Sequence, residues 1–161
     1  MKSIVKVVVS TLLISLFWTG IAFGAESTYE KQKVVYHINY DNPKAQFGAL
    51  RNIQNHINAV GADNLDLKVV LHGNGLALLL EPESLEKLGK FKHANATESM
   101  TAKIAGLKNQ GVDFQVCNNT INGRKVDYET DLYDVSKEDI VPSGVAEVAK
   151  LQALGYSYIK P

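Results

Sequence analysis

Short β-branched segments and segments with helical spacing alternate along this chain, and that alternation limits the folds it can adopt. Apolar residues recur at helical intervals in residues 47–60, 100–107 and 145–154, and each stretch is followed by a glycine suited to a helix C-cap, at Gly61, Gly111 and Gly155. The strand candidates are residues 33–39, 67–72, 112–117 and 156–160. This alternation predicts an α/β fold: a three-layer α/β/α sandwich of flavodoxin-like size, with a mostly parallel sheet of about five strands.

Two stretches fit the alternation less well. Residues 76–80, which follow Gly73-Asn74-Gly75, are all apolar. Periodicity over so short a run does not separate a buried helical turn from a short strand. Residues 122–139 are rich in acids and poor in large apolar side chains. We expect them to form a helix-and-loop connection on the surface, leading to a short strand at Ile140 and Val141.

The N-terminus predicts export. Residues 1–6 contain two lysines and no acid, residues 7–23 are nearly all apolar, and the small residues Ala22 and Gly24 suit cleavage after Gly24. Residues 1–24 are therefore expected to be a secretory signal peptide. We expect residues 25–161 to form a single domain in the periplasm or another extracytoplasmic compartment. The alternative is an uncleaved signal anchor, which would be the contact with the membrane.

Charge and cysteine content exclude some partners and some ways of stabilising the domain. The chain has 17 basic and 17 acidic residues, and loss of Lys2 and Lys6 with the signal leaves 15 basic residues against the same 17 acids. This slightly acidic balance, without a cluster of basic residues, argues against a nucleic-acid partner. A single cysteine rules out an internal disulfide, so the apolar core has to stabilise the domain unaided.

Polar residues follow the predicted strands at the edge where open α/β sheets bind ligands. The candidates are His37, Asn39 and Asp41 after the first strand, His72 and Asn74 after the second, Cys117, Asn118, Asn119 and Thr120 after the third, and Ser143 after the short fourth strand. They lie far apart in the sequence, but this fold would gather several of them at one edge.

Cys117 is the sharpest of these candidates. If Asn118 or Asn119 caps a helix that begins near Thr120, the sulfur lies beside unpaired N–H groups at the positive end of the helix dipole, which favours the thiolate. The alternative is a small buried hydrophobic residue that closes the strand.

The histidines allow two interpretations as well. His72 could orient or deprotonate the Cys117 thiol, or it could be a hydrogen-bonded side chain at a strand end. For His37 the structural interpretation is favoured, and His56 and His93 are expected on the surface. The sequence contains no pair of ligands at the spacing of a metal site and no complete phosphate loop. We therefore expect neither a metal nor a cofactor.

Several segments together resemble one family. They are VVLHGNGL at residues 69–76, GVDFQVCNNT at 111–120, VPSGVAE at 141–147 and GYSYIKP at 155–161. In this combination the chain resembles the DsrE/DsrF-like family, and more narrowly its exported, single-domain branch. The resemblance implies a layered α/β/α fold and assembly as homotrimers or hexamers, and it does not imply a metal or organic cofactor.

The resemblance also implies a chemistry. In sulfur-relay members of the family, a cysteine near the end of a middle strand carries sulfur as a persulfide between partners, and Cys117 falls where that cysteine is expected. We therefore expect a sulfur carrier of sulfurtransferase-like activity, with His37, His72, Asn74, Asn118, Asn119, Thr120 and Ser143 lining the pocket; its sulfur donor and acceptor are unknown. The alternatives are a non-catalytic binding or assembly module and a thiol redox sensor.

Overall fold

A single parallel sheet organises the chain. The computed structural model describes residues 29–161, and its strands are β1 (Gln32–Ile38), β2 (Leu65–Leu71), β3 (Asp113–Cys117), β4 (Ile140–Val141) and β5 (Ser157–Ile159). They form one five-stranded sheet in the order β4-β3-β2-β1-β5, and each neighbouring pair is parallel. The predicted α/β fold with about five strands is confirmed, and the sheet is parallel throughout.

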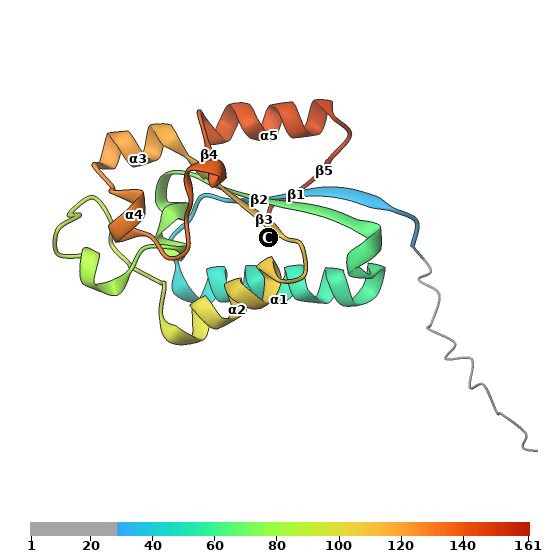
Figure 1. Cartoon of the computed structure of the whole chain (residues 1–161), viewed down its shortest axis with the longest axis horizontal. Coiled ribbons are helices and arrows are strands. Elements are labelled where there is room, and N and C mark those ends of the chain that lie inside the picture. The colour runs from blue at the N-terminus through green and yellow to red at the C-terminus, as the bar shows by residue number, and fades with distance from the viewer. Residues whose placement is uncertain (1–28) are drawn as a thin grey trace, which may run out of the picture.

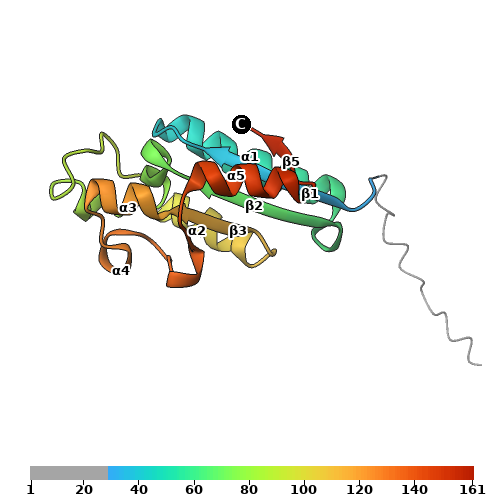
Figure 2. The ribbon, with the colours of Figure 1, turned by 90° about the horizontal axis from the view of Figure 1, so that it is seen from above.

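Helices cover both faces of this sheet (Figure 1). On one face lie α1 (Pro43–Val60) and α2 (Glu98–Lys108), and on the other lie α3 (Asn118–Arg124) and α5 (Gly144–Ala153). The view from above shows α5 lying over the strands, with α3 at the end of the sheet (Figure 2). The short helix α4 (Tyr128–Asp131) belongs to the connection between β3 and β4.

The two faces of the sheet are buried very unequally. The face under α1 and α2 carries the main core, which includes Leu50, Ile53, Leu71, Ile104 and Phe114. The face under α5 carries a small separate cluster of Val35, Val70, Val148 and Leu151. Because side chains alternate across each strand, the same strands supply both clusters. One face is therefore specified by apolar packing, and the other leaves space for polar groups.

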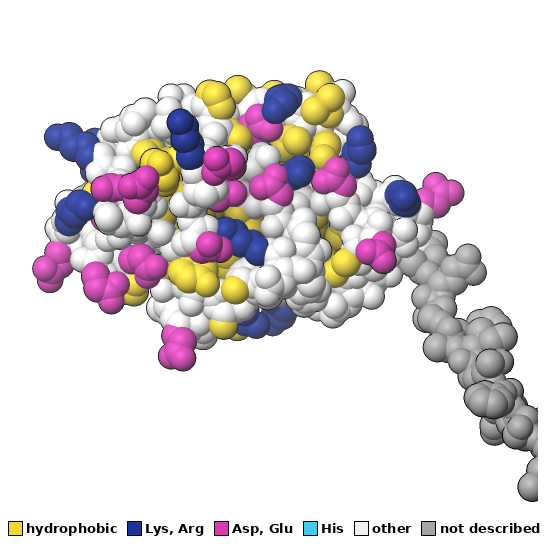
Figure 3. All heavy atoms as spheres, in the orientation of Figure 1, with side chains coloured by type: hydrophobic (Ala, Val, Ile, Leu, Met, Phe, Trp, Pro, Cys, Tyr) yellow, Lys and Arg dark blue, Asp and Glu magenta, His cyan; other side chains and the backbone are white. Residues whose placement is uncertain are grey.

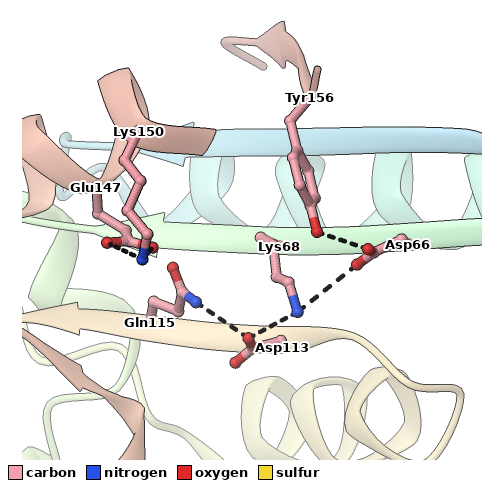
Figure 4. Close-up of polar contacts among 7 residues, drawn as sticks. All are labelled: Asp66, Lys68, Asp113, Gln115, Glu147, Lys150 and Tyr156. Carbon is pink, nitrogen blue, oxygen red and sulfur yellow. Dashed lines mark hydrogen bonds and ion pairs between the residues drawn. The ribbon is translucent and has the colours of Figure 1, made fainter. Parts of the chain in front are cut away.

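Polar side chains occupy the sheet beside α5 (Figure 4). The Lys68 ammonium lies 3.1 Å from Asp113 and 3.6 Å from Asp66. The Tyr156 hydroxyl donates to Asp66 at 2.5 Å. Burial, together with this hydrogen bond to Asp66 and its negative charge, raises the pKa of Tyr156 to about 12. These polar contacts connect β2, β3 and the segment before β5, beside the small apolar cluster against which Tyr156 also packs.

The structure assigns the two stretches that fit the alternation less well, residues 76–80 and 122–139. Residues 76–78 end a 3-10 helix, η2 (Gly73–Leu78), Leu79 lies in the turn that follows, and Leu80 forms an isolated antiparallel bridge with Leu132. All five side chains are fully buried. The acidic connection runs through α3, α4 and the 3-10 helix η4 (Lys137–Asp139) into β4, as predicted. Its placement entirely on the surface was wrong, because Asp131 is 1% exposed. That carboxylate accepts hydrogen bonds from Ser84, Lys87 and the Asp127 N–H at 2.8–2.9 Å.

The predicted signal peptide lies outside the described residues. Within residues 29–161, no helix combines the length and apolar character that a membrane crossing requires.

Candidate functional site

Four side chains from neighbouring strands form a row on the α5 face of the sheet. The row begins at Tyr158 of β5, whose hydroxyl is 2.9 Å from Nδ1 of His37 at the end of β1. The ring of His37 stacks on the ring of His72, with centroids 4.8 Å apart and planes inclined by 21°. His72 directly follows β2, and Cys117 is the last residue of β3. Both side chains lie against Gly144 of α5. The carboxyl edge of the sheet thus brings together His37, His72 and Cys117.

Cys117 is the last residue of β3 and the N-cap of α3, and it is 4% exposed. The sequence predicted a cap at Asn118 or Asn119 and a helix beginning near Thr120. Instead, α3 begins at Asn118, so the cysteine itself occupies the capping position. This places the sulfur closer to the helix start than predicted, beside N–H groups that have no partner within the helix.

Hydrogen-bond donors surround the sulfur and lower its pKa. Burial alone would raise the pKa of Cys117, but N–H groups of Gly144, Thr120 and Asn119, together with the Thr120 hydroxyl, outweigh it. In the thiol form the side chain makes no capping hydrogen bond of ordinary geometry. A thiol accepts weakly, whereas a thiolate attracts the same N–H and O–H groups strongly. These donors therefore favour the thiolate.

The N–H of Gly144 comes from a second helix, α5. Ser143 is the N-cap of α5, and its hydroxyl accepts from the Ala146 N–H at 3.4 Å. A Cβ atom on residue 144 would lie 2.8 Å from the Cβ of His72 and 3.2 Å from that of Cys117. Only a residue without a side chain allows this approach, so glycine at 144 brings the start of α5 to the thiol. The sequence places this glycine directly after a good N-cap residue, but its role depends on which strands lie beneath the helix.

Both histidines of the row are neutral at neutral pH. The pKa of His37 is lowered to about 4 by burial, with smaller contributions from His72 and Lys160. Burial, and then Lys160, also lowers the pKa of His72. Their Nε2 atoms are buried without a hydrogen-bond partner among the described residues. His72 is not among the groups that lower the pKa of Cys117. N–H groups and a hydroxyl, rather than an imidazolium, therefore stabilise the thiolate.

Three of the polar candidates, Asn74, Asp41 and Asn39, contact groups other than the Cys117 sulfur. The side chain of Asn74 accepts from Arg124 Nη2 at 2.6 Å, at the far end of α3. The Asp41 carbonyl accepts from Asn95 at 2.9 Å. The Cα of Asn39 lies at the close approach between β1 and Gly75. These residues shape the loops around the row rather than its centre.

The remaining histidines lie away from the row. His93 is exposed, as predicted. His56, also expected on the surface, is half-buried on α1, and its two ring nitrogens lie 3.1 Å from the Tyr36 hydroxyl and 2.8 Å from the Gln32 Oε1. Among residues 29–161, no group of three or more His, Cys, Asp or Glu side chains is arranged to hold a metal ion.

Comparison with known proteins agrees with this architecture. A model of the DsrE/DsrF-like family matches residues 32–161. A solved structure, that of the protein of unknown function MTH1491 from Methanobacterium thermoautotrophicum, superposes with a TM-score of 0.64. The two sequences are 24% identical, and the match covers 81% of this chain and 100% of the MTH1491 chain. At this identity the similarity supports the fold alone. Among curated proteins, no match was found.

Proposed function

Because the chain belongs to the DsrE/DsrF-like family, which is associated with sulfur relay, we propose that it is a sulfur carrier of sulfurtransferase-like activity. The observation that carries this proposal is the setting of Cys117. Its sulfur lies between the starts of two helices, and their N–H groups together with one hydroxyl lower its pKa. The thiolate is the reactive form of cysteine in sulfur exchange.

The chemistry requires two exchange steps. The Cys117 thiolate attacks the outer sulfur of a sulfane-sulfur donor, forming a new S–S bond, while the donor's own S–S bond breaks and its remaining part leaves with the electron pair. The persulfide anion on Cys117 then meets an acceptor thiolate, which attacks the terminal sulfur and regenerates the Cys117 thiolate. One sulfur atom moves from donor to acceptor, and no external oxidant or reductant is consumed.

The site favours an anion at both stages. The persulfide keeps its negative charge one atom further from the backbone than the thiolate does, still facing the same N–H groups. The neighbouring rings of His37 and His72 are neutral at neutral pH. The anion is therefore stabilised by hydrogen-bond donors and not by an ion pair with an imidazolium. This is the arrangement by which fixed donors stabilise a developing anion.

We propose the same assembly and location that the resemblance implies. Homotrimers or hexamers would cover apolar side chains that α5 turns to solvent, where Val145 is 64% and Leu154 57% exposed. On the face drawn in Figure 3, basic and acidic side chains are intermixed, and apolar side chains show along α5 at the top. Export with cleavage after Gly24 would place the carrier, its donor and its acceptor outside the cytoplasm.

The test is a transfer experiment on residues 25–161. The protein is incubated with thiosulfate or an organic persulfide, freed of donor, and treated with cyanide, which converts sulfane sulfur to thiocyanate. The proposal predicts thiocyanate in proportion to protein. It also predicts that the protein fraction loses this thiocyanate when the loaded protein first meets an acceptor thiol that is then separated from it. Cys117→Ser is the control and should yield none.

The alternatives predict other outcomes. A binding or assembly module would give no thiocyanate with either protein, and Cys117→Ser would leave its stability and assembly unchanged. A redox sensor would form a reducible covalent dimer through Cys117 upon oxidation. The 4% exposure of Cys117 opposes such a dimer, because two thiols must approach each other directly to form a disulfide.

A further inference from the structure

The turn after β2 is fixed to both ends of α3. At the start of the helix, the Gly73 N–H donates to Oγ1 of Thr120 at 2.8 Å. At its end, Arg124 donates to Asn74 at 2.6 Å. Gly75 also lies so close to β1 that a Cβ atom there would be 1.9 Å from the Ile38 carbonyl oxygen. The Gly73-Asn74-Gly75 turn is thus held at several points, and it holds α3 in turn.

The bond from Gly73 decides the direction of the Thr120 hydroxyl. A backbone N–H can only donate, so Thr120 Oγ1 must be the acceptor in this bond. A hydroxyl has a single proton, and the bond from Gly73 leaves that proton free for another acceptor. Gly73 has a φ of 57°, a left-handed conformation that glycine adopts without strain, and this conformation directs its N–H.

Cys117 is the neighbour of Thr120 on the first turn of α3. Thr120 is the third residue of the helix and Cys117 is its N-cap, and side chains three residues apart lie on the same side of a helical turn. The Gly73 N–H therefore donates to the Thr120 hydroxyl, and the proton of that hydroxyl is free to turn toward Cys117 on the same turn of the helix.

We propose that Thr120 is a positioning residue of this site: its hydroxyl, oriented by the Gly73 N–H, donates to Cys117 and holds the sulfur as an anion between the two helix starts. Gly144, Thr120 and Asn119 also supply backbone N–H groups, which side-chain substitution does not remove. The Thr120 hydroxyl is a side-chain group, so a substitution at residue 120 does remove it. This assignment gives the glycine-rich turn a role in orienting a donor. It deepens the proposed function, and it can be measured without any sulfur transfer.

The experiment compares Thr120→Val, Thr120→Ser and Asn119→Ala with the unchanged protein. Valine keeps the shape of threonine without the hydroxyl, serine keeps the hydroxyl, and Asn119→Ala alters the next side chain while leaving its N–H in place. The pKa of Cys117 is measured from the pH dependence of iodoacetamide alkylation and from the ultraviolet absorbance of the thiolate.

We expect Thr120→Val to raise the pKa of Cys117 by about one unit, which lowers alkylation about tenfold at a pH below both pKa values. Thr120→Ser and Asn119→Ala should retain the original pKa. Circular dichroism reports whether each variant is folded, and Thr120→Ala replaces Thr120→Val if the latter does not fold.

An unchanged pKa in a folded variant without the hydroxyl would overturn the assignment, as would a Thr120→Ser variant that behaves like Thr120→Val. Failure of sulfur transfer is a separate result. A protein whose Thr120 variants shift the pKa as expected, but whose Cys117 takes up no sulfur, would contradict the proposed function and leave the role of Thr120 intact.

Discussion

The imidazole rings of His37 and His72 stack 4.8 Å apart at the ends of two adjacent strands, and both rings are neutral at neutral pH. Protonation of one ring opposes protonation of the other, because two like charges would then lie in contact in a half-buried setting. The stack therefore supplies polar groups beside Cys117 without adding a permanent positive charge.

This stack should make folding stability sensitive to acid. The folded pKa of His37 is about 4, below the ordinary value of 6.5, so the folded state favours the neutral ring. Its contribution is present above pH 6.5 and is lost as the pH falls through 4. We expect urea unfolding between pH 7 and pH 4 to show a smaller loss of stability for His37→Gln than for the unchanged protein. Identical pH profiles would show that His37 does not titrate as described.

Gly144 should be indispensable to the charge on the thiol. A methyl group at residue 144 would press on the Cβ atoms of His72 and Cys117, which are attached to strand ends and cannot swing away. We expect Gly144→Ala to move the start of α5, raise the pKa of Cys117 and cost about 1–3 kcal/mol of stability. Alkylation kinetics and urea unfolding measure the two effects.

Gly106 supplies the matched control for this substitution. It lies in α2, and nothing is within 4 Å of the position that its Cβ would occupy. Gly106→Ala should leave the pKa of Cys117 unchanged and stabilise the protein slightly, by about 0.5–1 kcal/mol. If the two alanine variants gave the same thiol pKa, close packing at Gly144 would not be what brings α5 to the sulfur.

Asp131 should be the acid on which the connection between β3 and β4 depends most. It is nearly fully buried, and Lys87, the Asp127 N–H and Ser84 lower its pKa against the effect of burial. Asp131→Ala removes charge-assisted hydrogen bonds and should cost about 2–3 kcal/mol. Asp134→Asn is the comparison, because it removes the charge that pairs with Lys108 at an exposed position, where such a pair is worth about 0–1 kcal/mol. Asparagine also suits the left-handed backbone of residue 134, whose φ is 49°. Urea unfolding measures the stability that each variant loses. Equal losses for the two variants would contradict the special role of Asp131.

The fold could be predicted because its signals are local. Short β-branched segments and helical patterns located the main strands and helices to within a few residues, and a parallel sheet then placed the ends of several strands at one edge. This placement was enough to predict that several of the polar candidates gather at one edge, and His37, His72 and Cys117 do so.

The rest of the site depends on contacts between distant segments. The approach of Gly144 follows from where α5 crosses the sheet, and the burial of Asp131 follows from Ser84 and Lys87, which lie 47 and 44 residues away in sequence. Asp131 has the composition of a surface residue, and periodicity carries no information on such partners. The cap of α3 was misplaced for a local reason, since asparagine caps helices far more often than cysteine does.

The most direct test of sulfur carriage by Cys117 is the intact mass of residues 25–161 after incubation with a sulfane-sulfur donor and removal of the excess. We predict a gain equal to one sulfur atom, located on Cys117, reversed by a reducing thiol and absent from Cys117→Ser. A folded protein whose Cys117 is alkylated as a low-pKa thiolate, yet whose mass stays unchanged with thiosulfate and with an organic persulfide, would contradict it.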